Sequence, residues 1–166
     1  RKAQQSPSQI RAASIDRGLI AEQPAPVPYS TSGLGMDDHS GDPYVLQRFV
    51  DAQDPVYGQV CSELRQGLKM THWIWFIFPQ IKGLGSSAMS RKYSISSLEE
   101  AAAYLDHRIL GPRLLECATL VIDISDRNIK RILGPTDCEK FRSSMTLFAR
   151  ATAENQVFED ALHKYF

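Results

Sequence analysis

The sequence predicts an all-α fold, an irregular multi-helical single domain with about six or seven helices. From Asp42 onward, apolar residues recur at spacings of three and four, which is the period of a helix with one buried face. Proline follows an acid or a glycine at three expected helix starts, and there is little strand signal. With 166 residues, of which 43% are hydrophobic and 23% charged, the chain is long enough for one core.

Residues 1–41 differ from the rest in composition and are predicted to be a disordered or linker-like tail. They are rich in Gln, Ser, Ala and Pro and show no sustained apolar period. The predicted helical domain therefore spans residues 42–166. Because Met36 is followed by D-D-H-S-G-D-P-Y, we expect Met36 to be the native start and the preceding residues to be an upstream extension.

The first two helices are predicted after Asp42-Pro43 and Asp54-Pro55. In each pair the acid is expected to cap the helix and the proline to occupy its first position. The apolar face of the first helix consists of Val45, Leu46, Phe49 and Val50, and that of the second consists of Val56, Val60, Leu64 and Leu68.

The segment from Trp73 to Ile77 is the ambiguous element. Its aromatic and β-branched residues suit a strand, but no partner strand is predicted elsewhere in the chain. A helix or an extended core segment is therefore expected, which Pro79 ends and a turn at Gly83 and Gly85 follows.

Five further helices are predicted in the second half of the chain. Ser97–Glu100 and Thr136–Glu139 both have the spacing of a capping box, in which the first and fourth residues satisfy each other's backbone N–H groups. Gly111-Pro112 begins another helix, and Gly134-Pro135 ends a short one that carries Ile129, Ile132 and Leu133. The last helix carries Val157, Phe158, Ala161, Leu162 and Tyr165.

Charge and apolar content argue against several classes of protein. Nineteen Lys and Arg residues balance 19 Asp and Glu residues, so neither nucleic acid nor a membrane surface is an expected partner. The longest apolar run, Trp73 to Pro79, is much shorter than the roughly 20 residues that span a bilayer. No signal-like segment stands near the start, and a cytoplasmic location is predicted.

Neither a metal site nor a cofactor is predicted. The histidines form no H-x-x-x-H pair and no cluster with cysteine, and G-L-G-S-S lacks the lysine of a P-loop. The three cysteines, Cys61, Cys117 and Cys138, are widely separated, which favours reduced thiols.

Positive charge gathers locally although the chain as a whole is neutral. Between Leu64 and Leu98 there is no Asp or Glu, and this stretch contains the cations Arg65, Lys69, Lys82, Arg91 and Lys92. An anion is the natural partner for such a stretch. Two functions are therefore predicted: a pocket for an anionic small molecule, nucleotide-like or phosphate-like, or a non-enzymatic protein-interaction or regulatory module with a basic face.

If the pocket catalyses a reaction of its ligand, the catalytic candidates are His72, Arg91 and Tyr93. His72 would be the acid or base, Arg91 would stabilise charge, and Tyr93 would orient the ligand through its hydroxyl. The alternative for His72 is a structural role, in which it caps a helix or bonds a buried carbonyl. Whether any reaction occurs is left open.

A second group of residues is predicted to bind the ligand. The Gly83–Ser87 turn can offer backbone N–H groups to a phosphate or can be a tight turn only. Trp75 can stack on a ligand or pack in the core, and the hydroxyls of R-S-S-M-T can face a ligand or bond the preceding helical turn. The predicted ligand-binding residues are Trp75, Gln80, Gly83, Gly85, Ser86, Ser87, Arg113, Ser143 and Ser144.

Several longer motifs resemble those of one bacterial family. They are L-Q-R-F-V-D-A-Q, H-W-I-W-F-I-F-P-Q-I-K-G-L-G, S-R-K-Y-S-I, L-G-P-R-L and R-S-S-M-T-L-F. In this order they are similar to the DUF1810 family, also called Rv1873-like, over roughly residues 42–166. The resemblance implies a small, mostly helical cytosolic protein without an assigned activity, and a short Asp-containing segment beyond the position of Phe166.

Overall fold

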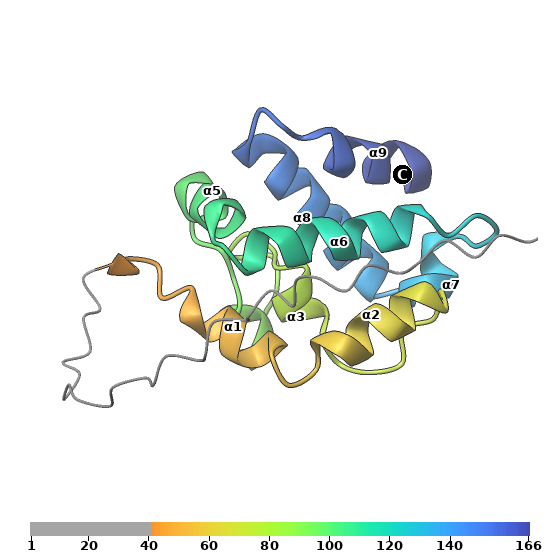
Figure 1. Cartoon of the computed structure of the whole chain (residues 1–166), viewed down its shortest axis with the longest axis horizontal. Helices are drawn as coiled ribbons and strands as arrows, with labels where there is room; N and C mark the ends of the chain where they lie inside the picture. Colours follow the sequence, from red (N-terminus) through yellow and green to blue (C-terminus); the bar gives the residue numbers. More distant parts are fainter. Residues whose placement is uncertain (1–40) are drawn as a thin grey trace, which may run out of the picture. The chain divides into compact units, whose positions relative to one another are not determined.

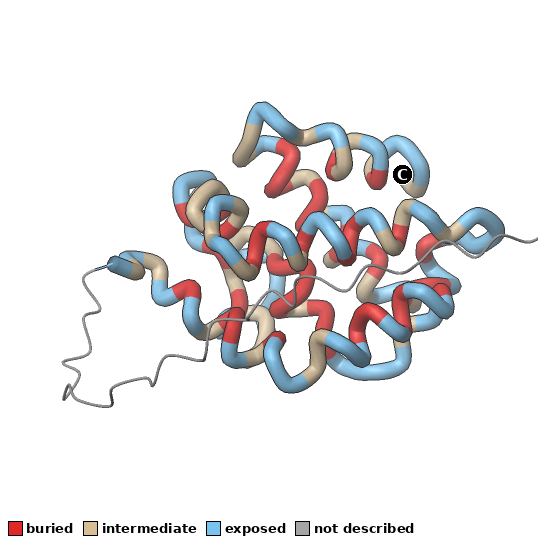
Figure 2. The backbone as a smooth tube through the Cα atoms, in the orientation of Figure 1, coloured by how far each residue is buried: buried red, intermediate tan, exposed pale blue. Residues whose placement is uncertain are grey.

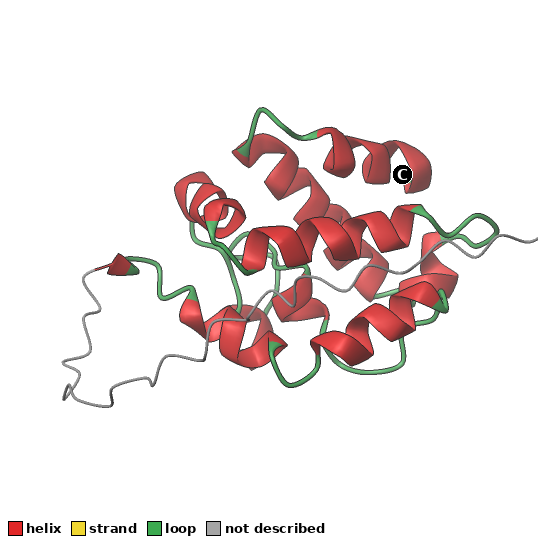
Figure 3. Ribbon diagram, in the orientation of Figure 1, coloured by secondary structure: helices red, strands yellow, loops and turns green. Residues whose placement is uncertain are grey.

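The computed structural model describes residues 41–166, and these residues contain nine helices and no strand (Figures 1 and 3). The expected all-α class is confirmed. The predicted tail, apart from Gly41, and the predicted start at Met36 lie outside the described residues. The helices are α1 (Gln47–Gln53), α2 (Tyr57–Arg65), α3 (Ile74–Ile77), α4 (Ala88–Lys92), α5 (Leu98–Asp106), α6 (Leu110–Ile122), α7 (Ile129–Leu133), α8 (Asp137–Ala151) and α9 (Gln156–Tyr165).

The expected number of six or seven helices is too low for the described part of the chain. The two helices beyond the seven expected are α3, with four residues, and α4, with five. Neither is long enough to show two turns of apolar periodicity, which is the signal that reveals a helix in a sequence. The ambiguous segment at Trp73 is thus helical, and the turn after it leads into a helix that the sequence did not predict.

Several helix starts differ from the capping patterns. The first helix begins at Gln47 rather than next to Pro43, and Asp42 accepts a hydrogen bond from the Gln47 backbone N–H at 3.1 Å. Thr136 makes no side-chain cap to α8. At α5 the cap is present, because the Ser97 hydroxyl accepts from the Glu100 backbone N–H at 3.2 Å.

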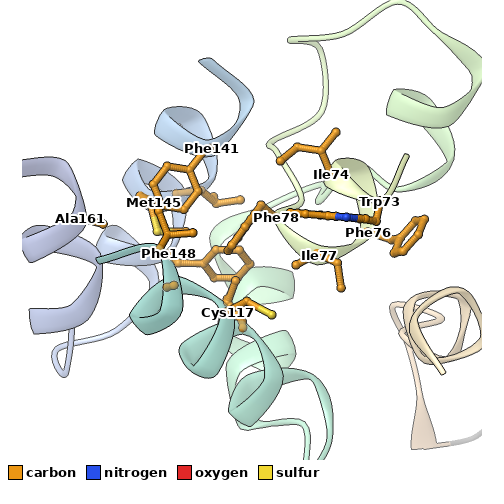
Figure 4. Packing of buried hydrophobic residues seen from close by; sticks show 14 of the residues in the cluster. Trp73, Ile74, Phe76, Ile77, Phe78, Cys117, Phe141, Met145, Phe148 and Ala161 are labelled. Carbon is orange, nitrogen blue, oxygen red and sulfur yellow. The ribbon is translucent and has the colours of Figure 1, made fainter. Parts of the chain in front are cut away.

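The core lies where α8 packs against α3, α5, α7 and α9, and α6 packs against α2, α5 and α9 (Figures 1 and 2). Of the aromatic residues at α3, Trp73 and Phe78 point into it, whereas Phe76 points to the other side of the helix, where it contacts Tyr93 (Figure 4). The rings of Phe78 and Phe141 meet edge to face at 4.8 Å between centroids, a favourable geometry for aromatic pairs. Most of the aromatic segment therefore serves the core.

Among the described residues, one isolated parallel β-bridge, between Ile81 and Ile95, joins the two ends of the segment that contains the Gly-Ser turn and α4. Lys82 donates its backbone N–H to the Ile95 carbonyl, and Ile95 donates to the Gln80 carbonyl, both at 2.8 Å. In an extended segment neighbouring side chains point to opposite sides. Ile81 and Lys82 are consequently directed to different parts of the surface.

No helix in residues 41–166 combines the length and apolar character needed to cross a membrane.

We expect Gly111→Ala to lower the free energy of unfolding by about 2 kcal/mol or more, because overpacking forces backbone shifts. A β-carbon at Gly111 would lie 1.9 Å from the Leu105 carbonyl oxygen, where only three residues separate α5 from α6. Gly58→Ala in α2 is the matched control, since its β-carbon would meet nothing within 4 Å. Chemical denaturation should find the control unchanged or more stable by about 0.5–1 kcal/mol. Equal effects of the two substitutions would contradict this packing.

Candidate functional site

The predicted acid or base, His72, lies between two residues, Thr71 and Trp73, that donate to the buried carboxylate of Glu63. Glu63, only 5% exposed, accepts hydrogen bonds from the backbone N–H groups of Met70 and Thr71 at 2.8 and 3.1 Å and from the Trp73 indole at 2.8 Å. Burial opposes the charge of Glu63, but these bonds outweigh it and lower its pKa to about 2. Glu63 is thus a fixed anion that holds the loop before α3, and the His72 side chain itself is exposed.

Trp75 is half-buried and contributes to a second structural cluster. The Lys140 ammonium lies 5.5 Å from the Trp75 ring, and Asp137 accepts from Lys140 at 2.6 Å and from Lys69 at 2.7 Å. Burial opposes ionisation of Asp137, but the two ammonium groups overcome it and hold its pKa below the usual value. A protein ammonium group thus lies over the indole that was predicted to stack on a ligand.

The five cations of the acid-free stretch divide into two groups in the structure. Arg65 pairs with Glu116 of α6 at 3.3 Å, and Lys69 pairs with Asp137 of α8. Lys82, Arg91 and Lys92 are exposed and form no ion pair with any described residue. Positive charge is therefore concentrated in this stretch as predicted, but only three of its five cations are free of ion pairs with described residues.

These three cations surround a hollow of about 420 Å³ that we call the basic hollow. The segment before α1, α1 itself, Lys82, the end of α4 with the residues after it, and the start of α5 form it. Its lining consists of Pro43, Tyr44, Val45, Arg48, Lys82, Arg91, Lys92, Ser94, Ser96 and Glu100.

Arg48 forms the floor of the basic hollow and uses all five of its N–H donors within the protein. Its guanidinium donates to the carbonyls of Lys92 at 3.2 Å and Ser94 at 3.0 Å, to those of Tyr44 and Val45, and to Glu100 at 2.7 Å. Glu100 also accepts from the backbone and hydroxyl of Ser96. The floor is therefore neutral and rigid, and the carbonyl oxygens around it are already bonded.

Val45, at the rim of the basic hollow, has an unusual backbone. Its φ of 53° is in the left-handed region, which is an outlier for a β-branched residue, and its side chain is 62% exposed. The Arg48 bonds to the carbonyls of Tyr44 and Val45 hold this conformation. A strained backbone conformation of this kind persists only where several contacts with the surrounding structure fix it, and such conformations are concentrated at binding sites.

The predicted phosphate-binding turn is exposed, and its polar groups serve α4. Ser87 caps the helix, with its hydroxyl accepting from the Ser90 backbone N–H at 3.1 Å. Arg91 donates to the Ser86 carbonyl. Gly85 lies so near Ser90 that a β-carbon would come within 2.5 Å of the Ser90 β-carbon, and Gly83 has a φ of 100°. The glycines are thus explained by the turn itself.

The hydroxyls of α8 are placed differently from one another. Ser143 and Thr146 each donate to the carbonyl four residues earlier at 2.9 Å, so neither has a hydrogen left for an anion. Ser144 faces the core, and its hydroxyl is the buried side-chain oxygen without a partner among the described residues. Of the remaining predicted residues, Tyr93 is buried against Phe49 and Phe76, and Arg113 pairs with Asp54 at 2.8 Å. Gln80 is half-buried, and its backbone carbonyl accepts from Ile95.

A second hollow, of about 540 Å³, runs beside α8, and we call it the α8 groove. Its apolar lining is Ile81, Leu84, Leu98 and Leu147. Its polar lining is Glu139, Arg142, Ser143, Thr146 and Arg150. The two hollows share no lining residue.

The structure thus does not bring the predicted site residues together. Arg91 lines the basic hollow, Ser143 lines the α8 groove, and His72 lines neither. Sequence reasoning missed Arg48, and it assigned Glu100 to a helix cap only. Nothing in the sequence around Arg48 indicates this role, because its partners Ser94 and Glu100 lie 46 and 52 residues away along the chain.

Within residues 41–166 there is no group of three or more His, Cys, Asp and Glu side chains arranged to hold a metal ion. All three cysteines are buried and unbridged, and burial raises the pKa of the Cys117 and Cys138 thiols. Such thiols are poor nucleophiles.

These features define a small all-helical domain in which the basic hollow and the α8 groove are separate, and two further hollows of about 240 and 590 Å³ lie elsewhere on its described part. Residues 43–166 match the family described as "Protein of unknown function (DUF1810)", and the chain belongs to this family. It is similar to the protein in "Crystal structure of the conserved hypothetical protein Rv1873 from Mycobacterium tuberculosis at 1.38 A", with 59% identity and a TM-score of 0.74. That similarity covers 75% of this chain and 89% of the other. No curated protein matches the chain.

Proposed function

We propose that the domain is a non-enzymatic binding module that takes an anionic group in the basic hollow. The observation that carries this proposal is the presence of Lys82, Arg91 and Lys92 around one hollow without a partner carboxylate. Three like charges held near one another repel, and an anion placed among them relieves that repulsion. The two lysines supply compact charges, and Arg91 supplies a planar pair of donors suited to phosphate or carboxylate.

The neutral floor supports the same proposal. Because Arg48 already bonds the carbonyls of Tyr44, Val45, Lys92 and Ser94, no ring of bare oxygens repels an incoming anion. Ser94 likewise bonds the Arg91 carbonyl at 3.0 Å. An anion in the hollow would therefore face the three cations and not a ring of unbonded carbonyl oxygens.

Binding without turnover is the better interpretation of this site. General acid–base chemistry needs a titratable group within hydrogen-bond reach of the ligand. The basic hollow holds no histidine, and its carboxylate, Glu100, is occupied by Arg48 and Ser96. The proposed role for Arg91 is thus ligand binding, and His72 and Tyr93 take no part in it.

The proposal is tested by thermal shift and calorimetry on the full chain with inorganic pyrophosphate, ADP-ribose and a polyglutamate peptide. A probe at 100 times its Kd should add about 2.7 kcal/mol to the free energy of unfolding, which raises the Tm by several degrees. The triple variant Lys82→Gln, Arg91→Gln, Lys92→Gln should weaken binding at least tenfold, because charged hydrogen bonds each contribute about 1.5–3 kcal/mol.

The matched control is Arg108→Gln, Lys130→Gln, Arg131→Gln, which removes the same charge from exposed residues outside the hollow. It should bind as the wild type does. Equal losses in the two triples would mean that net charge alone attracts the probes. Binding of the polyglutamate peptide alone would establish the protein-interaction alternative, and binding of no probe would refute an anion site.

A further inference from the structure

We propose that the α8 groove is a second, separate binding site, which takes an amphipathic monocarboxylate with its carboxylate at Arg150 and its apolar body over Leu84, Leu98 and Leu147. This site does not depend on the basic hollow, with which it shares no residue. Its volume of about 540 Å³ is within the range of small-ligand pockets, about 300–1,000 Å³.

The apolar wall of the groove supports an apolar ligand body. Leu84 is 58% exposed and Leu98 is 46% exposed, and both line the groove together with Ile81 and Leu147. Two exposed leucines that converge on one concave surface differ from scattered surface leucines, which need no explanation. Covering them would remove apolar area from water, at about 25 cal/mol per Å².

The charges along α8 support a single anionic head and fix its position. Arg142 and Arg150 are eight residues apart, which corresponds to about 12 Å along the helix. Arg142 lies over the Phe166 ring at 5.4 Å and lines the groove together with Glu139, whereas Arg150 has no acidic neighbour in the lining. The end of the groove near Glu139 is thus close to neutral, and the Arg150 end is positive.

The hydroxyls of the groove point to the same ligand class. Ser143 and Thr146 have donated their hydrogens to backbone carbonyls, so toward a ligand they act as acceptors. An anion therefore depends on the arginines, and a second carboxylate near Ser143 would meet acceptors and the Glu139 carboxylate. A monocarboxylate satisfies this arrangement better than a dicarboxylate does.

The test uses calorimetry on the full chain with decanoate, decanedioate, decanol and acetate, all below micelle-forming concentrations. Decanoate should bind more tightly than any of the other three probes. Acetate lacks the apolar body, decanol lacks the charge, and decanedioate brings a second carboxylate toward Glu139. Glu139→Gln should remove most of the preference for decanoate over decanedioate, which is a readout that a merely destabilised protein would not give.

Two further variants locate the ligand within the groove. Arg150→Gln should weaken decanoate binding at least tenfold and leave decanol unchanged. Leu98→Ser should weaken both probes, whereas Leu115→Ser, an exposed leucine of α6 outside the groove, should weaken neither. The proposal is overturned if decanoate does not bind, if Arg150→Gln binds it as the wild type does, or if decanedioate binds the wild type as tightly as decanoate.

Discussion

Glu63→Ala is expected to lower the free energy of unfolding at pH 7 by about 3 kcal/mol, because buried donors left without an acceptor each cost about 1–3 kcal/mol. The carboxylate accepts from Met70, Thr71 and Trp73, and also from the Thr71 hydroxyl at 2.7 Å and Gln59 at 3.1 Å. Its removal leaves the Trp73 indole N–H buried without a partner. Urea denaturation measures the change.

The effect of Glu63→Ala should depend on pH in a defined direction. The folded-state pKa of Glu63 is about 2, below the ordinary value of 4.5. Its ionised form therefore stabilises the fold above about pH 4.5, and this stabilisation is lost as the pH falls from 4.5 through 2. The difference between wild type and variant should shrink by roughly 2 kcal/mol between pH 7 and pH 3.

Ser62→Ala is the control for this prediction, since Ser62 is the exposed neighbour of Glu63 on α2. It should change the free energy of unfolding by no more than about 0.5 kcal/mol. A pH-independent difference for Glu63→Ala would show that packing, and not the charge of the carboxylate, accounts for the loss.

Arg48→Ala is expected to have a comparable effect, about 3–5 kcal/mol, because it leaves a buried carboxylate unpaired. The Glu100 side chain is 4% exposed, and Arg48 is its cationic partner. The same substitution releases four carbonyls from two segments of the chain. Arg48→Lys should recover only part of the stability, since one ammonium group cannot reproduce the five-donor fork.

Arg65→Ala is the matched control for Arg48→Ala. It breaks an arginine–glutamate pair of the same kind, but the two side chains are 58% and 46% exposed. Exposed pairs contribute about 0–1 kcal/mol, so the control should be nearly neutral in guanidinium denaturation. Adding Glu100→Gln to Arg48→Ala should restore some stability, because the second change removes the orphaned charge. Similar losses for Arg48→Ala and Arg65→Ala would refute the structural role of Arg48.

Local patterns predicted the helices well and their ends less well. The stripe through Val60 and Leu64 identified α2, because such a stripe needs no knowledge of what covers it. The start of α1 was misplaced because Asp42 bonds Gln47 across an intervening turn with Val45 in a left-handed conformation. A proline after an acid suits that turn as well as it suits a helix start.

The site was harder to predict because its charges are balanced across long sequence separations. Arg65 and Lys69 lie in a stretch without acids, yet acids from α6 and α8 neutralise them. Arg48 meets Glu100 in the same way, from another helix. Counting charges within a window therefore identified the basic region correctly but overstated its extent.

His72, Arg91 and Ser144 do not line one hollow together, for a related reason. Sequence shows that Ser144 and Phe148 share a face of α8, but it does not show that this face is the core. Similarly, nothing in the aromatic run indicates that the Trp73 indole is held by Glu63. Residue type suggested suitable chemistry, and tertiary packing decided which groups remain available.

The bridge between Ile81 and Ile95 sets a limit on how chains of this kind can vary in length. Ile81 and Leu98 line the α8 groove, whereas Lys82 and Ser96 line the basic hollow. Shifting an extended segment by one residue exchanges the sides to which its side chains point. Loss or gain of a single residue at this bridge would move a lysine toward the leucines and an isoleucine toward the cations. Substitutions here are consequently easier to accommodate than single-residue insertions or deletions.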